Sequence, residues 1–109
     1  MRLLDLDPRW LLKDGKRVGF VFQNPVRGHK GWWASCFFEP TPSEVQDDLI
    51  SAQVGEDAIW QSCNPASGWS CSPPADQADF ATLSITPSLD GGPNLWHGHI
   101  TNGQIVGGI

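Results

Sequence analysis

The sequence has no tyrosine, one methionine, three cysteines and few basic residues among its 109 positions. Seven lysines and arginines against twelve acidic residues give a formal net charge of −5. A surface that binds nucleic acid or anionic lipid needs a clustered excess of Lys and Arg. No apolar run approaches the roughly 18–20 residues that a membrane-spanning helix requires. The composition therefore predicts neither a nucleic-acid partner nor a membrane partner.

The cysteines are too few for a disulfide framework, and their number is odd (Cys36, Cys63 and Cys71). A secretory signal is not expected either, because Asp5 and Asp7 interrupt the apolar start of the chain. Both observations favour a reducing compartment, the cytoplasm of the cell that makes the protein.

Glycine and proline are abundant, with 12 and 9 copies, and the chain also carries six tryptophans and five phenylalanines. A length of 109 residues predicts a single domain over residues 1–109, without room for a second core. Because each tryptophan buries a large area, a turn-rich chain of this kind can build a core from few residues.

The first third predicts a helical turn and two strands. Asp7 and Pro8 are typical of a helix start, so we expect a helical turn at Pro8–Leu12 that ends at Asp14–Gly15. Residues 17–23 alternate, with Val18, Phe20 and Phe22 on one face. Residues 32–38 form an apolar run that predicts a second, buried strand, and the two strands read as a hairpin with a long loop.

The middle of the chain leaves alternatives open. Ser43 and Gln46 have the spacing of a capping box, which indicates either a short helix or irregular structure. A short strand is expected at residues 58–61. Residues 63–78 are rich in Ser, Pro and Gly and predict a long loop, in which Trp69 is a candidate anchor for a protein contact.

The last third has the clearest pattern. Strands are expected at residues 79–86, with Ala81, Leu83 and Ile85 on one face, and at residues 95–101. Asn102–Gly103 predicts a type I′ hairpin turn, followed by a returning strand at residues 104–106. The expected fold is all-β, a small open barrel or a two-layer sandwich of hairpins, with one or two short helical turns.

Two histidines lie two residues apart in an expected strand, a spacing that suits two ligands of one metal ion. His97 and His99 would need a third ligand, such as His29, Asp90 or a cysteine. The alternative is that they line the polar face of a strand. Because the sequence has no paired Cys-x-x-Cys and no His-x₃-His spacing, we favour that alternative and expect neither a metal nor a cofactor.

A serine nucleophile is the second chemical hypothesis. Ser88 lies between a proline and a Gly-rich turn, His97 begins the facing strand, and Asp79 opens the strand that leads to Ser88. These residue types form a catalytic triad in which the histidine is the general base and the aspartate orients it. The backbone of Gly91–Gly92 would then donate to the oxyanion.

Three segments in this order resemble a known family: residues 4–11 (LDLDPRWL), 82–89 (TLSITPSL) and 96–103 (WHGHITNG). The family comprises small phage and bacterial proteins that are often mislabelled ammonia monooxygenase. Its bacterial members accompany ubiquitination-like operons and look like serine peptidases with a Ser-His-Asp triad. The resemblance implies that Ser88 is the nucleophile and His97 the base, with Asp79 or Asp90 as the third member.

The resemblance has one departure, because family members usually carry a Cys-rich cluster after the first strand, whereas residues 23–30 here contain no cysteine. We therefore carry two functional hypotheses forward. The first is a phage-associated serine-peptidase-like hydrolase that cleaves a peptide or ester bond of a protein substrate in the host cytoplasm. The alternative is a non-catalytic virion protein (a decoration, cement or joining protein) that works through self-assembly or through contacts with capsid or tail proteins.

Overall fold

The computed structural model describes residues 1–23, 25, 32–38, 46–54, 59–60, 69–90 and 97–107. Within them the chain is mostly β, with one short helix and one 3-10 turn, and without a closed barrel. The sequence prediction of an all-β fold with short helical turns is therefore confirmed. In chain order the elements are η1 (Leu3–Leu6), β1 (Arg9–Lys13), β2 (Lys16–Gln23), β3 (Trp32–Phe37), α1 (Gln46–Val54), β4 (Ile59–Trp60), β5 (Ser70–Ser72), β6 (Ser84–Asp90), β7 (His97–Thr101) and β8 (Gln104–Val106).

The helical turn near the start of the chain lies earlier than predicted. It is η1, and it ends at Asp7, which has φ +50° in the left-handed region. The predicted turn at Pro8–Leu12 is wrong, because residues 9–12 belong to β1. The residue before a proline is disfavoured in the helical conformation, so Asp7–Pro8 ends a helical turn here instead of beginning one.

The first sheet has the order β1-β2-β3-β4. The first three strands are antiparallel, as predicted for β2 and β3, and β4 pairs parallel to β3. A register shift separates Leu11 from Leu12 in the pairing of β1 with β2. Opposite this shift, Val18 packs with Val21 against the helix side of the sheet, and not with Phe20 and Phe22 as the simple alternation predicts. A bulge changes the face of every residue beyond it, and the alternation alone does not reveal it.

The second sheet has the order β5-β6-β7-β8, with antiparallel neighbours throughout. Residues 102–103 form the predicted turn, with φ +50° at Asn102 and +73° at Gly103. Two expectations are corrected. The strand predicted from Asp79 begins only at Ser84 and continues to Asp90, and the described part of the expected loop 63–78 contains β5.

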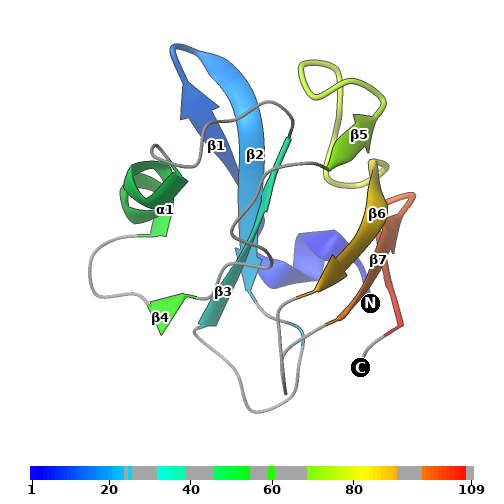
Figure 1. Cartoon of the computed structure of the whole chain (residues 1–109). Helices are drawn as coiled ribbons and strands as arrows, with labels where there is room; N and C mark the ends of the chain where they lie inside the picture. Colours follow the sequence, from blue (N-terminus) through cyan, green and yellow to red (C-terminus); the bar gives the residue numbers. More distant parts are fainter. Residues whose placement is uncertain are drawn as a thin grey trace.

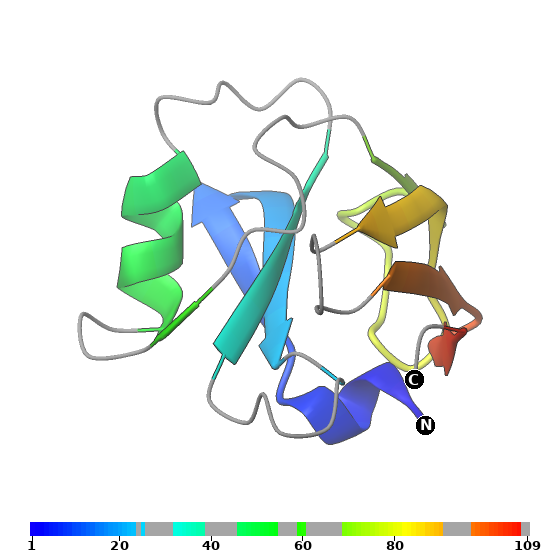
Figure 2. The same cartoon turned by 60° about the horizontal axis from the view of Figure 1, so that its bottom comes forward.

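Two hydrophobic clusters lie on the two faces of the first sheet, which gives the molecule three layers (Figures 1 and 2). The larger cluster lies between the sheets and joins Phe20 and Phe22 of β2 to Ile85 and Ile100 of the second sheet. The smaller cluster lies between the first sheet and α1. Its buried members are Leu11, Val21, Trp33, Phe37 and Ile50.

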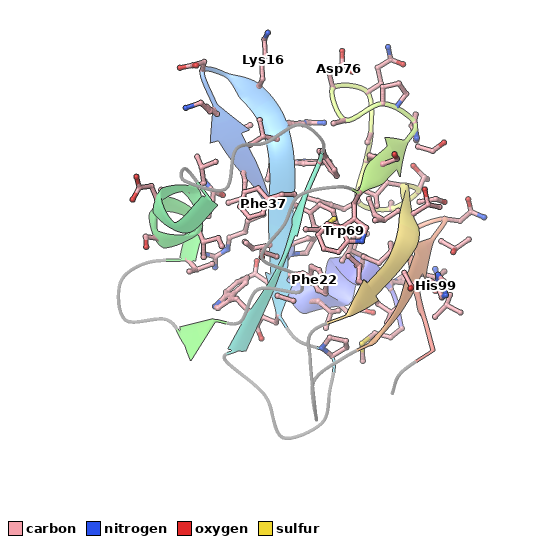
Figure 3. The ribbon with its side chains drawn as sticks, viewed as in Figure 1. Lys16, Phe22, Phe37, Trp69, Asp76 and His99 are labelled. Atoms are coloured by element: carbon pink, nitrogen blue, oxygen red, sulfur yellow. The ribbon has the colours of Figure 1, made fainter. Side chains whose placement is uncertain are left out.

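Trp69 connects the two sheets directly. It forms a β-bridge with Phe38 at the end of β3, and its backbone N–H donates to Phe37 O at 3.4 Å. Its side chain is only 5% exposed and lies between the layers (Figure 3). The sequence hypothesis that Trp69 is an anchor for a protein contact is therefore wrong, because its side chain is buried where the two sheets meet.

The short helix that the sequence left open is present as α1, and its Ile50 is 1% exposed against the first sheet. In the described part of the chain, no helix is long and apolar enough to cross a membrane.

Candidate functional site

Ser88 lies in an irregular stretch of β6. The pairing of β6 with β7 shifts register between Ile85 and Leu89, so the strand is locally distorted immediately before Leu89. Leu89 is fully buried, whereas Ser88 is half-buried. The indole Nε1 of Trp69 donates to the backbone carbonyl of Ser88 at 3.3 Å. Irregularities of this kind re-aim side chains and are frequent beside functional sites.

His97 lies on the neighbouring strand, close to Ser88 in the register. The backbone pairs Asp90 with His97 and Leu89 with Gly98. Ser88 and His97 are therefore not directly opposite each other, but lie on adjacent strands about two positions apart. Diagonal neighbours of this kind are typically about 7–8 Å apart.

Asp79 is at the other end of β6 and is not brought to this pair. Its Oδ1 accepts a hydrogen bond from the backbone N–H of Ala81 at 2.8 Å, and its carbonyl accepts from Thr82 and Leu83. The same end of the sheet carries the Asn102–Gly103 turn, because Gly103 N–H donates to Leu83 O at 2.8 Å. The length of a seven-residue strand, about 20 Å at 3.3 Å per residue, separates this end from His97.

The acidic residue beside His97 in the structure is Asp90, the second aspartate that the sequence offered for the orienting role. It is the direct backbone partner of His97 across the β6–β7 ladder. Gly91 and Gly92, the expected oxyanion donors, lie outside the described residues.

The residues considered as metal ligands are the other chemical candidates. His99 is exposed on β7, opposite Val106 of β8 (Figure 3). Among the described residues, no group of three or more His, Cys, Asp or Glu side chains is arranged to hold a metal ion. His29 and Cys63 lie outside the described residues.

The two described cysteines are free thiols in different environments. Cys36 is fully buried, as expected from its apolar strand. Cys71 is partly exposed, and burial raises the pKa of its thiol, while the positive charge of Arg17 opposes that rise. The raised pKa keeps the Cys71 thiol protonated at neutral pH, so it is a poor nucleophile.

The sequence analysis missed a pocket beside the β1–β2 turn. This pocket has a volume of about 490 Å³ and lies between the β1–β2 turn and the segment after β5. Its lining residues are Gly15, Lys16, Arg17, Ala75 and Asp76. One sequence signal could have indicated it: Lys13, Lys16 and Arg17 are three of the seven basic residues of an acidic chain, and they fall within five positions.

Comparison with known proteins adds no further assignment, because no family model, no curated protein and no solved structure matches this chain.

Proposed function

We propose that this protein is a serine hydrolase that cleaves a peptide or ester bond. In this proposal Ser88 is the nucleophile, His97 is the general base, and Asp90 replaces Asp79 as the residue that orients the imidazole. The observation that carries the proposal is the β6–β7 register, which pairs Asp90 with His97 while Ser88 lies two residues earlier on the same strand. A nucleophile, a base and an orienting acid on neighbouring strands are the elements of a triad.

The reaction would proceed in two steps through an acyl-enzyme. The Ser88 hydroxyl oxygen attacks the substrate carbonyl carbon while His97 accepts the hydroxyl proton. The imidazolium then donates that proton to the departing amine or alcohol, which leaves an ester between Ser88 and the acyl group. A water molecule, deprotonated by His97, next attacks this ester. The acid product departs and the proton returns to Ser88.

The local fold supports the role of Ser88 in two ways. Leu89 is fully buried and fixes the strand beside the nucleophile, and the hydrogen bond from Trp69 Nε1 holds the Ser88 carbonyl. The hydroxyl itself belongs to a half-buried residue, which a reagent can reach. Positioning of this kind is a main source of catalytic rate in enzymes.

The test is labelling of the folded protein with a fluorophosphonate, which reacts with activated serines. We expect labelling of the wild-type protein that is lost in Ser88→Ala and in His97→Ala. Ser70→Ala is the matched control, because Ser70 is an exposed strand serine elsewhere in the same sheet, and it should label normally.

Two further variants separate the two aspartates. Asp90→Asn should reduce labelling strongly, whereas Asp79→Asn should leave it near the wild-type level, because Asp79 only closes a turn. Absence of labelling in the folded wild-type protein would overturn the proposal. Normal labelling in Asp90→Asn would remove Asp90 from the site.

A second candidate is a non-catalytic virion structural protein, and one observation favours it. Val106 is 46% exposed on β8, beside Met1, which is 57% exposed and whose carbonyl accepts from Ile105 N–H. Apolar side chains at a sheet edge suit a protein–protein contact. This candidate predicts an unlabelled protein that is found in purified particles, in an interface of at least about 1,000 Å².

A further inference from the structure

The pocket between the β1–β2 turn and the segment after β5 is lined by two basic residues, Lys16 and Arg17. Arg17 is held in place by contacts with the rest of the protein. Lys16 and Arg17 are the first two residues of β2, and both line the pocket. Figure 3 shows Lys16, at the tip of the β1–β2 hairpin, and Asp76, in the segment after β5, at the same end of the molecule. None of the described lining residues belongs to the proposed hydrolase site, so the pocket is argued independently of that site.

The Arg17 guanidinium is held in place by three contacts. Its Nη1 donates to the backbone carbonyls of Ala75 at 3.0 Å and Ala78 at 2.9 Å, and its central carbon lies 4.3 Å from the centre of the Trp10 ring. A guanidinium has five N–H donors, and these two bonds use the two on Nη1. Within the described part of the chain, Nε and Nη2 keep their donors for a ligand. Because the group is already ordered, a ligand that binds it need not restrict a flexible side chain.

Lys16 supplies a second positive charge. The register of the β1–β2 hairpin places it directly opposite Lys13. Like charges directly opposite each other in a sheet are destabilising, and a bound anion would relieve their repulsion. Residues 13–17 carry three positive charges and one negative charge, Asp14, in a chain whose net charge is −5.

Among the described lining residues of the pocket, Asp76 is the one carboxylate. With Lys16 and Arg17, the lining carries two positive charges against this one negative charge, so it favours an anion. The Asp76 carboxylate repels that anion. This opposition gives the pocket a signature: removing the Asp76 charge should strengthen anion binding and weaken the binding of any cation.

We propose that this pocket binds a small anionic ligand through a carboxylate or phosphate group, with Arg17 as the ordered donor and Lys16 as a flexible second donor. Both groups present acceptor oxygens that match the planar donors of an arginine. A volume of about 490 Å³ accommodates a small organic anion.

The experiment is a titration of the ¹⁵N-labelled protein with inorganic phosphate and, separately, with succinate, at constant ionic strength. We expect saturable chemical-shift changes at the backbone amides of residues 15–17 and 75–76 for at least one anion. The comparison of phosphate with succinate identifies which of the two groups the pocket prefers.

Three exposed-residue variants make the test specific. Lys16→Ala should weaken binding about threefold and Asp76→Asn should strengthen it about threefold, the size of single surface charge contacts. Lys13→Ala is the matched control, because Lys13 faces Lys16 in the hairpin but does not line the pocket, and it should change the affinity less.

Three results would overturn the proposal. The first is the absence of saturable shifts with both anions. The second is equal weakening in Lys13→Ala and Lys16→Ala, which would indicate diffuse attraction without a site. The third is weaker anion binding in Asp76→Asn. None of these results bears on labelling of Ser88.

Discussion

At the scale of single residues, Arg17 links the two sheets. It belongs to β2, yet its guanidinium donates to the carbonyls of Ala75 and Ala78 in the segment between β5 and β6. Trp10, whose ring Arg17 covers, also stacks on Phe80 at a centroid distance of 4.2 Å. A charged donor on two partly buried carbonyls contributes more than a surface ion pair, because the carbonyls lose their partner when it is removed.

We therefore expect Arg17→Met to destabilise the protein by about 1–3 kcal/mol, since methionine keeps an unbranched stem but donates no hydrogen bond. The measurement is the midpoint of urea unfolding. Arg2→Met is the matched control: the Arg2–Asp5 pair is exposed, with side chains 62% and 48% accessible, and its loss should shift the unfolding midpoint much less than Arg17→Met does. Equal destabilisation by both variants would contradict this role of Arg17.

The candidate triad shows how far single residues could be assigned from the sequence. Ser88 and His97 were selected from their neighbours along the chain, and the structure places them on adjacent strands. The choice between Asp79 and Asp90 needed the register of β6 with β7. That register contains a shift between Ile85 and Leu89, which no local sequence pattern reveals. The activity of the triad stays a prediction.

At the scale of elements, two hairpins share one turn type in different surroundings. Asp14–Gly15 joins β1 to β2 and Asn102–Gly103 joins β7 to β8, with similar positive φ values at both glycines, +77° and +73°. A side chain added at Gly15 would meet nothing within 4 Å. One added at Gly103 would collide with the backbone carbonyl of Ala81.

Substitutions at these two glycines distinguish the cost of backbone strain from the cost of a steric clash. We expect Gly15→Ala to cost about 1–2 kcal/mol, the penalty of the left-handed conformation alone. Gly103→Ala should cost about 1–3 kcal/mol more, because the 80–82 segment must shift to admit the methyl group. Thermal unfolding of both variants measures the difference. Equal losses would mean that the Ala81 segment yields without cost.

The same two turns show why element prediction succeeded in one place and failed in another. Asn102–Gly103 lies between two alternating segments and was predicted as a hairpin turn, which is confirmed. Asp14–Gly15 carries the same signal, but Asp7–Pro8 before it also has the composition of a helix start. The pairing of Trp10 with Phe20 stabilises the hairpin over the helical turn, and that contact is made only in the folded chain.

At the scale of the whole molecule, β2 belongs to both hydrophobic clusters. Phe20 and Phe22 face the second sheet, whereas Val21 faces α1. Composition and alternation predict an all-β fold, a small open barrel or a two-layer sandwich. They do not predict the third layer, because α1 is only nine residues long and lies beside an undecided segment. Ile50 of α1 is buried because the helix packs on the first sheet, a contact that is made only in the folded chain.

Because one strand carries both clusters, the three layers should unfold as a single unit. We expect Ile100→Ala, in the second sheet, and Ile50→Ala, in α1, each to destabilise the protein by about 2–5 kcal/mol, since both side chains are at most 1% exposed. Native-state hydrogen exchange measures the opening free energy of slowly exchanging amides. Each variant should lower this free energy equally in α1 and in the second sheet.

The control is Val106→Ala, whose side chain is 46% exposed and whose truncation should change protection in neither layer by more than about 0.5 kcal/mol. The contrary outcome is protection in α1 that Ile100→Ala leaves unchanged. The helix layer would then open without the sandwich, and the Phe20–Val21–Phe22 segment would not transmit stability between the clusters. Equal losses would instead show that the alternation of three consecutive side chains in β2 couples the helix to the second sheet.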